Sequence, residues 1–512
     1  MRVPLEYRRG VAVAGILLVI FLFAIDATVV SAAMPTIVGK LGGLELYSWV
    51  FSSYMLTSAL GTPLFGNLSD LYGRRRLMLA GIALFMLGSA LCGAAQSLAQ
   101  LIVFRAVQGI GGGAIYALSF ILIGYLYPPD RRAQMQALVS GLWGIASILG
   151  PLAGAVITQY WSWRWIFFIN LPVCCAAAAL IAFGMDEAGS GRRHQLDWMG
   201  MATLLTGLLL AFYALEEARM TAFTFDWALA AASILSIGAL VLFYRVELYA
   251  AEPILPLGLF RLRLFKLCLA LAWLASMGMF AVISYLPLYV QGALGGDAAR
   301  VGIALVPASL GWTVGSFIAG GGVNRYGYRA GCVAGAAVMT VGYGLFVAFE
   351  PQLGFALVLS IGALIGVGMG MLTLTSMVAA QNGVPRDRLG VATSAVMLAR
   401  LFGGAFGIVL VGSVLFSRMQ HELSALSDAS MSAAARGALQ KLATPEQMLD
   451  PMLRSAIPAS VLAGLETVLR NSIRTAFVAG LCVMVLALGV SFFMAKKRPS
   501  SDAAHSRNAS VA

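Results

Sequence analysis

Charged side chains are scarce in this chain: only 11% of its 512 residues are Asp, Glu, Lys or Arg. Soluble globular domains carry about 25% charged residues, so a string of soluble domains is excluded. Hydrophobic residues make up 60% of the chain, and the mean hydropathy is +0.87. An intrinsically disordered chain has the opposite composition. The sequence therefore indicates a polytopic membrane protein.

Histidine is almost absent, and the cysteines lack the spacing of a metal site. His194, His421 and His505 lie in polar segments, which excludes an intramembrane histidine relay for protons and a histidine-bound metal ion. The six cysteines lie inside apolar runs without CxxC spacing, so they are interpreted as packing residues of helices: Cys92, Cys174, Cys175, Cys268, Cys332 and Cys482. We expect neither a metal site nor a disulfide.

Enzyme motifs are missing as well. The sequence contains no HExxH, GxSxG or phosphate-loop pattern, so neither a membrane enzyme nor an ATP-driven pump is favoured. The glycine-rich run from Gly109 to Gly113 superficially fits a dinucleotide fingerprint, but it lies in an apolar run with no preceding strand. Close packing between helices explains these glycines better. We expect no enzyme activity and no cofactor.

Long apolar runs are what the sequence has in abundance. A hydrocarbon core of roughly 30 Å needs about 20 apolar residues per helix. The runs lack the short polar and apolar alternation of an outer-membrane barrel, so an all-α fold is expected. Fourteen spans are predicted, at residues 11–34, 47–66, 77–96, 99–125, 134–158, 165–185, 198–217, 227–246, 266–290, 301–322, 331–349, 353–378, 390–416 and 472–495.

Lys and Arg concentrate in alternate loops, and short cytoplasmic loops are the ones that retain basic residues. With the N-terminus inside, most of the 34 basic residues fall on the cytoplasmic side, with clusters at Arg8–Arg9, Arg74–Arg76 and Arg131–Arg132. The net charge of +12 then reflects orientation in the cytoplasmic (inner) membrane, with both termini cytoplasmic, and nucleic-acid binding is not expected. A cleaved signal peptide is disfavoured because Asp26 interrupts the first apolar run.

An internal repeat relates two loops of the chain. They share the spacing Gly-x3-Asp/Asn-x2-Gly, at Gly66, Asp70 and Gly73 in the first loop and at Gly320, Asn324 and Gly327 in the second. A second pair of similar segments is Pro129–Arg132 and Pro385–Arg388. Each copy lies eight predicted spans from its counterpart, so a six-helix unit is duplicated with two extra spans between the copies. Two halves around a midplane cavity are typical of transporters.

The repeat predicts three parts of the chain. Residues 1–190 form a six-helix bundle, residues 191–250 form two linker spans, and residues 251–512 form a second six-helix bundle with a cytoplasmic tail at 496–512. The segment 417–471 is predicted to lie outside the membrane as short amphipathic helices. It covers the outer mouth, contacts a periplasmic partner or serves as a solvated linker, and the sequence leaves these alternatives open.

Five segments carry a resemblance to a known family: Asp26–Pro35, Gly66–Arg76, Arg105–Gly112, Gly144–Gly154 and Trp163–Pro172. With these motifs the sequence resembles the major facilitator superfamily, and more closely its fourteen-span drug:proton antiporter branch. The resemblance covers nearly the whole chain. Departures from the family pattern occur at Ser31, Ala155 and Asn324. The resemblance implies two six-helix bundles with two extra spans between them, and a monomer.

Asp26 and Arg105 are the candidates for proton coupling. A carboxylate at mid-membrane costs roughly 2.5–3.5 kcal/mol on insertion scales, so Asp26 is a functional candidate by default. A helical rise of about 1.5 Å per residue puts Arg105 at a similar depth. Burial favours a neutral carboxyl and a nearby guanidinium favours an ionised one, so a contact that is made and broken loads and releases protons. The alternative is a fixed ion pair between the first and fourth spans.

The loop motif is the candidate for a conformational latch. Gly66 and Gly73 permit close approach of helices, while Asp70 and Arg74 form charge contacts that hold in one state and break in the other. The resemblance implies the same role. The alternative, a plain orientation signal, explains Arg75 and Arg76 but not the glycines or Asp70.

The fifth span carries small residues at Gly144, Gly150 and Gly154, and Pro151 removes a backbone hydrogen bond. We expect this span to pack closely against the tenth span of the other half and to form part of a hinge. By resemblance the Gly-Pro motif is associated with antiporters. The alternative is ordinary packing without coupling.

Thr28, Gln108, Gly109 and Arg400 are candidates for the central cavity. No acid in the later spans is an evident partner of Arg400, so it faces the cavity, meets an anionic substrate group or reaches backbone carbonyls. The expected function is proton-coupled antiport that exports amphipathic drugs or metabolites by alternating access, with the proton gradient as energy source. The alternative is an exporter or flippase of a lipid or lipid-linked compound.

Overall fold

The computed structural model describes residues 5–41, 47–185, 197–220, 227–250, 257–294, 298–349, 354–385, 388–427 and 459–496. Side chains of a few residues within these ranges, Asp70 among them, lie outside the described part. The first half of the described chain contains α1 (Leu5–Leu41), α2 (Tyr47–Tyr72), α3 (Arg74–Ala94), α4 (Leu98–Leu126), α5 (Pro129–Tyr160), α6 (Trp165–Phe168) and α7 (Asn170–Gly184). It is followed by α8 (Trp198–Met220) and α9 (Trp227–Tyr249).

The second half begins with a short 3-10 helix and continues with long helices. Its elements are η2 (Leu257–Arg261), α10 (Arg263–Leu288), the π-helical turn η3 (Tyr289–Ala293), α11 (Ala298–Phe349), α12 (Phe355–Asn382), α13 (Leu389–Ser427) and α17 (Ala459–Ser491). The described residues contain no strand. A helix satisfies its own backbone hydrogen bonds, which is what a chain inside hydrocarbon requires.

Twelve helices in the described part of the chain are long and apolar enough to cross a membrane. The all-helical membrane fold is therefore confirmed, whereas the count of fourteen spans is not. The helix α2, rich in Ser and Thr, coincides with the second predicted span but is not among the twelve. Within α11, the predicted spans 301–322 and 331–349 are two helical stretches that meet at Gly327, whose backbone is not helical.

The kink in α11 matches the break between α2 and α3. Gly327 has a φ of 81° and Gly73 a φ of 96°, and these are the described glycines with positive φ. A side chain with a Cβ is strained in this region of backbone conformation, whereas glycine is not. The two glycines that the internal repeat pairs thus have the same conformational reason to be glycine.

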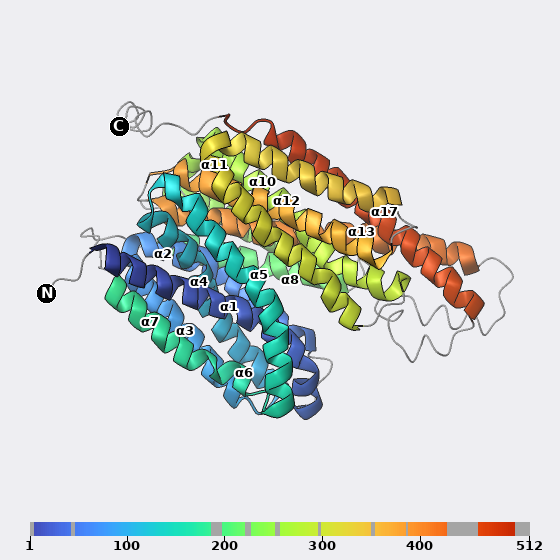
Figure 1. The fold of residues 1–512 in the computed structure, drawn as a ribbon, viewed down its shortest axis with the longest axis horizontal. Helices are drawn as coiled ribbons and strands as arrows, with labels where there is room; N and C mark the ends of the chain where they lie inside the picture. Colours follow the sequence, from blue (N-terminus) through green and yellow to red (C-terminus); the bar gives the residue numbers. More distant parts are fainter. Residues whose placement is uncertain are drawn as a thin grey trace.

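Two bundles make up the molecule (Figure 1). In the first, α1 packs on α5 and α7, while α4 packs on α2 and α3. In the second, α10 packs on α13, and α11 packs on α12 and α17. The linker helices α8 and α9 pack on each other, and α8 also contacts α2 and α13, one helix from each bundle.

The bundles meet at one end of the molecule through a group of polar side chains, named here the inter-bundle clasp: Arg132 and Gln136 of α5, and Gln381 and Asn382 of α12. The Gln136 amide donates to Gln381 Oε1 at 2.5 Å, and Arg132 Nη1 donates to Asn382 Oδ1 at 2.8 Å. Gln381 also donates to the Phe120 carbonyl at 3.3 Å. In Figure 1 the bundles converge at this end and lie apart at the opposite end, where α6 belongs to one and the start of α17 to the other.

Both ends of the described chain lie on the side of the clasp. The Arg9 guanidinium of α1 stacks 4.0 Å above the ring of Tyr127, which follows α4. At the other terminus, the Arg329 amide in the loop region of α11 donates to the Ala495 carbonyl at 3.2 Å. Arg9 and Arg329, two of the basic residues predicted to be cytoplasmic, thus lie on the same side of the molecule.

The two helices that flank the predicted outer segment 417–471 extend into it. The helix α13 continues to Ser427, and α17 begins at Ala459, so the stretch from 459 to 469 is the start of a long helix and not a separate surface helix. An Arg418–Glu422 ion pair at 2.8 Å, spaced one helical turn apart, supports the extension of α13. Residues 428–458, the middle of this segment, lie outside the described residues, so a cover of the outer mouth, a periplasmic partner site and a solvated linker all stay open.

The six cysteines have free thiols in the structure. Four are buried, whereas Cys175 and Cys482 are exposed on the surfaces of their helices. Cys175 nevertheless contacts α3, with its Sγ 3.7 Å from the Sδ of Met86.

Candidate functional site

Asp26 of α1 and Arg105 of α4 form an ion pair inside the first bundle. Arg105 Nη1 lies 2.7 Å from Asp26 Oδ2. Asp26 is 2% exposed and Arg105 is 1% exposed. The similar depths expected from helical rise bring the two side chains into direct contact.

The second carboxylate oxygen of Asp26 is held by two neutral amides. Gln108 of α4 and Asn170 of α7 each donate a hydrogen bond to Asp26 Oδ1 at 3.0 Å. Gln108 Oε1 in turn accepts from Arg105 Nη1 at 2.8 Å. An ionised carboxylate only accepts hydrogen bonds, so this surrounding of donors suits the charged form of Asp26.

Asn170 is itself held in place by the third helix. Its amide also donates to Ser89 Oγ at 3.0 Å, and the Ser89 hydroxyl donates to the Phe167 carbonyl at 2.9 Å. Asn170 begins α7 directly after the short α6. Pro172 has no N–H for the carbonyl four residues earlier, which explains why the helical ladder is interrupted here. Ser89 and Asn170 are buried, so the whole chain of hydrogen bonds is shielded from water.

Tyr54 of α2 covers the other side of the ion pair. The Arg105 guanidinium carbon lies 3.9 Å from the centroid of the Tyr54 ring. The Tyr54 hydroxyl is buried without a hydrogen-bond partner and lies close to Gly112. A Cβ at position 112 would lie 2.8 Å from this hydroxyl oxygen. Glycine has no Cβ and therefore avoids a clash with Tyr54.

An aromatic cluster adjoins the site through Tyr54. Phe23 lies 6.2 Å from Tyr54, stacks on Tyr116 at 5.5 Å and meets Trp143 edge-on at 5.7 Å, measured between ring centroids. These rings come from α1, α2, α4 and α5. Phe23 lies three residues before Asp26 on the same helix, so the aromatic surface and the acid are neighbours.

The arrangement can hold, release and move a proton, and it has no evident place for a metal. Within the described residues, no group of three or more His, Cys, Asp or Glu is placed to hold a metal ion. A buried ion pair costs desolvation of both charges, and here hydrogen bonds on both carboxylate oxygens offset that cost. Removing one partner would leave an uncompensated buried charge.

A sequence model of the Major Facilitator Superfamily matches residues 16–408, which include every residue of this site. The chain belongs to the major facilitator superfamily. Two relatives from Bacillus subtilis (strain 168) are similar over almost their whole length. Multidrug resistance protein 3 is 34% identical over 506 residues, covering 97% of each chain. Multidrug transporter protein MdtP is 32% identical over 505 residues, covering 95% of this chain and 93% of its own.

Solved structures of the superfamily share the fold. The proton:xylose symporter XylE aligns with a TM-score of 0.62 at 14% identity, covering 98% of this chain and 99% of its own. The human organic anion transporter MFSD10 aligns with a TM-score of 0.62 at 16% identity, covering 96% of this chain and all of its own. At these identities the likeness concerns the fold alone, and the fold is that of a multi-pass membrane transporter.

The superfamily's loop motif is placed at the seam between the bundles. A Cβ at Gly66 would lie 2.6 Å from the Cβ of Ser394 in α13, so glycine permits this approach. The Arg74 guanidinium stacks 4.2 Å above the ring of Tyr125. The side chain of Asp70 lies outside the described residues, so the latch stays a prediction.

The second copy of the loop motif makes a contact between the bundles. The Asn324 amide donates to the Asp130 carbonyl at the start of α5. A carboxylate, which the superfamily motif has here, would be an acceptor and would not make this bond.

The glycines of the antiporter motif face two different neighbours. A Cβ at Gly144 would lie 2.3 Å from Thr313 Oγ1 of α11, which confirms that the fifth span packs closely on the tenth. A Cβ at Gly150 would instead lie 1.9 Å from Thr28 Oγ1 of α1, in the same bundle. Pro151 is exposed and Gly154 is buried. The motif thus serves packing within and between bundles, and its hinge role stays a prediction.

The candidate cavity residues separate into three places. Gln108 belongs to the Asp26 site itself. Thr28 donates to the Ala146 carbonyl of α5 at 3.1 Å, and Gly109 packs against the backbone of Tyr54, so both serve close helix packing. Arg400 lies in the other bundle, with its guanidinium carbon 5.3 Å from the centroid of the Trp312 ring.

Asn170, Ser89 and Tyr54 are the site residues that the sequence did not single out. Asn170 lies in the Trp163–Pro172 motif, for which the sequence indicated no function. Ser89 and Tyr54 carry no mark in the sequence, because a neutral polar residue in an apolar run is common. The inter-bundle clasp was missed for the same reason.

Proposed function

We propose that this protein is a proton-coupled antiporter that exports amphipathic drugs or metabolites across the cytoplasmic membrane by alternating access. The observation that carries the proposal is the buried Asp26–Arg105 pair, with both carboxylate oxygens held by donors. Intramembrane acids mark proton pathways in transporters. The two Bacillus subtilis relatives support export of drugs, since they are named as multidrug resistance and multidrug transporter proteins.

The proton acts by changing what Asp26 can accept. When Asp26 binds a proton, it loses its charge, and its attraction to Arg105 weakens because one member of the pair is neutral. The protonated oxygen also becomes a donor and repels the N–H that pointed at it. Helices α1 and α4 then gain freedom to shift relative to one another, which couples proton binding to rearrangement of the bundle.

The contacts between the bundles support one of the two states that alternating access requires. The clasp and the Asn324–Asp130 bond join the bundles at the end that carries the basic clusters, and the Gly144–Thr313 contact joins them midway along α5. With these clusters in the cytoplasm, the structure corresponds to a state closed to the cytoplasm. The opposite state requires these contacts to part.

The aromatic cluster suits amphipathic substrates. Phe23, Tyr116 and Trp143 offer apolar ring faces, and such faces also attract cations. Substrate bound there would lie next to Asp26, so a lipophilic cation and a proton would compete for the same negative charge. The proton gradient is the energy source, no cofactor is needed, and we expect a monomer.

The experiment is proton release from acidified everted vesicles on addition of a panel of lipophilic cations, neutral drugs and anionic amphiphiles. Release by the wild type, with the compounds that trigger it, establishes antiport and defines the substrate class. If no compound of the panel causes proton release, the result contradicts drug export and favours export of a lipid or lipid-linked compound.

A further inference from the structure

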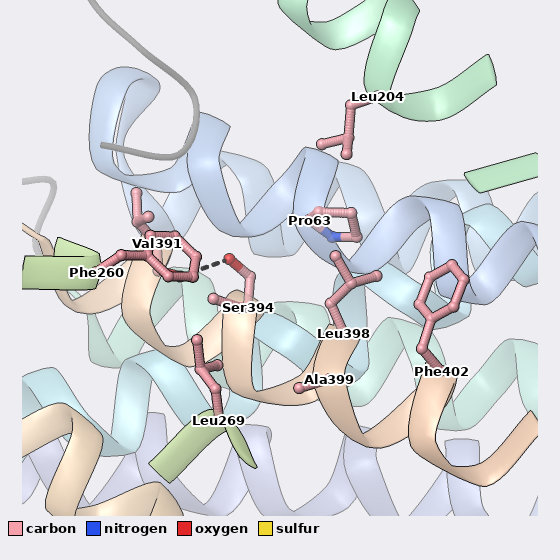
Figure 2. A pocket seen from close by; sticks show the side chains of 10 residues that line it. Pro63, Leu204, Phe260, Leu269, Val391, Ser394, Leu398, Ala399 and Phe402 are labelled. Atoms are coloured by element: carbon pink, nitrogen blue, oxygen red, sulfur yellow. Dashed lines mark hydrogen bonds between the residues drawn. The ribbon is translucent and has the colours of Figure 1, made fainter. Parts of the chain in front are cut away.

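An apolar cavity of about 230 Å³ lies where the two bundles and the linker helices meet. Figure 2 shows side chains from α2, α8, η2, α10 and α13 in its wall, among them Pro63, Leu204, Phe260, Leu269, Leu398 and Phe402. Ser394 is the polar residue of the wall, and its hydroxyl donates to the Val391 carbonyl at 3.1 Å. The wall therefore offers an occupant hydrocarbon contacts and little else.

Water is a poor occupant of such a space. Apolar cavities stay dry, and one of about 150 Å³ lined by similar side chains takes up benzene. The wall residues Phe260, Leu398 and Phe402 are only half-buried, so the cavity reaches the surface of the molecule. At the depth of the membrane-spanning helices, that surface meets lipid, whose acyl chains match the wall in chemistry.

The position of the cavity along the helices places it closer to one membrane leaflet than to the other. Leu204 and Leu269 lie about 9 Å along α8 and α10 from the first residues of these helices, and Pro63 lies about 14 Å from the end of α2, at about 1.5 Å per residue. These helix ends are on the side of the basic clusters. The cavity is therefore within reach of an acyl chain from the leaflet predicted to be cytoplasmic.

Positive charges stand beside the cavity at the level of lipid headgroups. Phe260, in the wall, is followed by Arg261 at the end of η2 and by Arg263 and Lys266 at the start of α10. All three basic side chains are exposed. Basic residues next to a membrane surface attract anionic lipids.

We propose that the cavity binds one acyl chain of an anionic phospholipid from the cytoplasmic leaflet, with the headgroup at Arg261, Arg263 and Lys266. Because the wall combines α2 of one bundle with α10 and α13 of the other, the bound chain contacts both bundles. It lies beside the Gly66–Ser394 contact, so it stabilises the closed seam. Its wall contains none of the residues of the Asp26 site, so lipid binding can be measured without a drug or a proton gradient.

The test uses the full-length protein purified in detergent and native mass spectrometry. The protein is mixed with phosphatidylglycerol or phosphatidylcholine of identical acyl chains, and retained lipid is counted. Ala395→Trp fills the cavity, while Ile234→Trp adds the same side chain on the exposed face of α9 and serves as control. We expect the wild type and the control to retain phosphatidylglycerol. Ala395→Trp should retain about tenfold less, because the indole ring occupies the space in which several methylene groups of the lipid chain would be buried.

A second variant separates the headgroup from the chain. Replacing Arg261, Arg263 and Lys266 by Gln is expected to abolish the preference for phosphatidylglycerol over phosphatidylcholine while lipid is still retained. The proposal is overturned if Ala395→Trp retains as much phosphatidylglycerol as the wild type, or if the wild type retains both lipids equally. Should Ala395→Trp not fold, Ala399→Leu occupies less of the cavity and is expected to lower retention in the same direction.

Discussion

Asn170 donates a hydrogen bond to Asp26 across 3.0 Å, from a helix that begins 144 residues later in the chain. This bond ties the sixth predicted span to the candidate proton carrier on the first. Through Ser89 it also ties in the third helix. Hydrogen bonds thus connect the acid, directly or through Asn170, to three other helices of its bundle, α3, α4 and α7.

Replacing Asn170 by Ala removes one donor to the ionised form of Asp26. A hydrogen bond to a charged group is worth about 1.5–3 kcal/mol, so the pH at half-maximal drug-driven proton release should rise by about one unit. Ser89→Ala acts through Asn170 and should give a smaller rise. The pH profile of release measures both. Cys175→Ser on the exposed face of the same helix is the control, and an unmoved midpoint in Asn170→Ala would refute the positioning role.

Gln381→Ala should loosen the clasp. The Gln381 side chain bonds with Gln136, the Phe120 carbonyl and the Thr393 hydroxyl, so its loss should shift the ratio of closed to open clasp by about tenfold. Spin labels at the exposed positions Gln134 and Arg325 report the distance between the bundles by pulsed electron paramagnetic resonance. A longer-distance population is expected. Gln100→Ala, an exposed amide away from the clasp, should leave the distribution unchanged.

Gly144→Ala should impair turnover by forcing α5 away from α11. The added Cβ would lie 2.3 Å from Thr313 Oγ1, whereas the Thr313 Cβ is 3.1 Å away. Thr313→Ala removes the closest atom, so the double variant should recover much of the lost transport rate. Initial rates of substrate uptake into everted vesicles measure this. If the double variant is as slow as Gly144→Ala, close approach at this point is not what the glycine provides.

Arg400 should influence substrate choice and leave proton coupling intact. It stacks on Trp312 in the second bundle, and within the described residues no carboxylate lies within ion-pair distance. Arg400→Gln should lower transport of anionic amphiphiles by about tenfold relative to lipophilic cations, because a charge-assisted contact is lost. Arg400→Lys keeps the charge and should lie between the two. Equal loss for all substrates would place Arg400 in the structural framework.

The sequence predicted the Asp26–Arg105 pair because charge in an apolar run is conspicuous and helical rise gives its depth. It did not predict Asn170 and Ser89, since neutral polar residues reach a site only through the packing of several helices. The pairing of Gly73 with Gly327 was visible as spacing, and positive φ at both gives the physical reason.

Helix ends were harder to predict than helix centres. The hydropathy of α13 and α17 falls where they leave the hydrocarbon, but their backbone continues as helix with polar pairs such as Arg418–Glu422. A hydropathy pattern measures the apolar segment and not the helix. The ends of α13 and α17 therefore lie beyond the ends of the apolar runs.

The most direct test of the central claim compares Asp26→Asn with the wild type in two assays on the same proteoliposomes. The first is uptake of a transported drug driven by a pH gradient, and the second is exchange of labelled for unlabelled drug without a gradient. If Asp26 carries the proton, the variant loses gradient-driven uptake but keeps exchange and thermal stability. Gradient-driven uptake at the wild-type rate in Asp26→Asn would contradict the account and leave the Asp26–Arg105 pair as a structural contact.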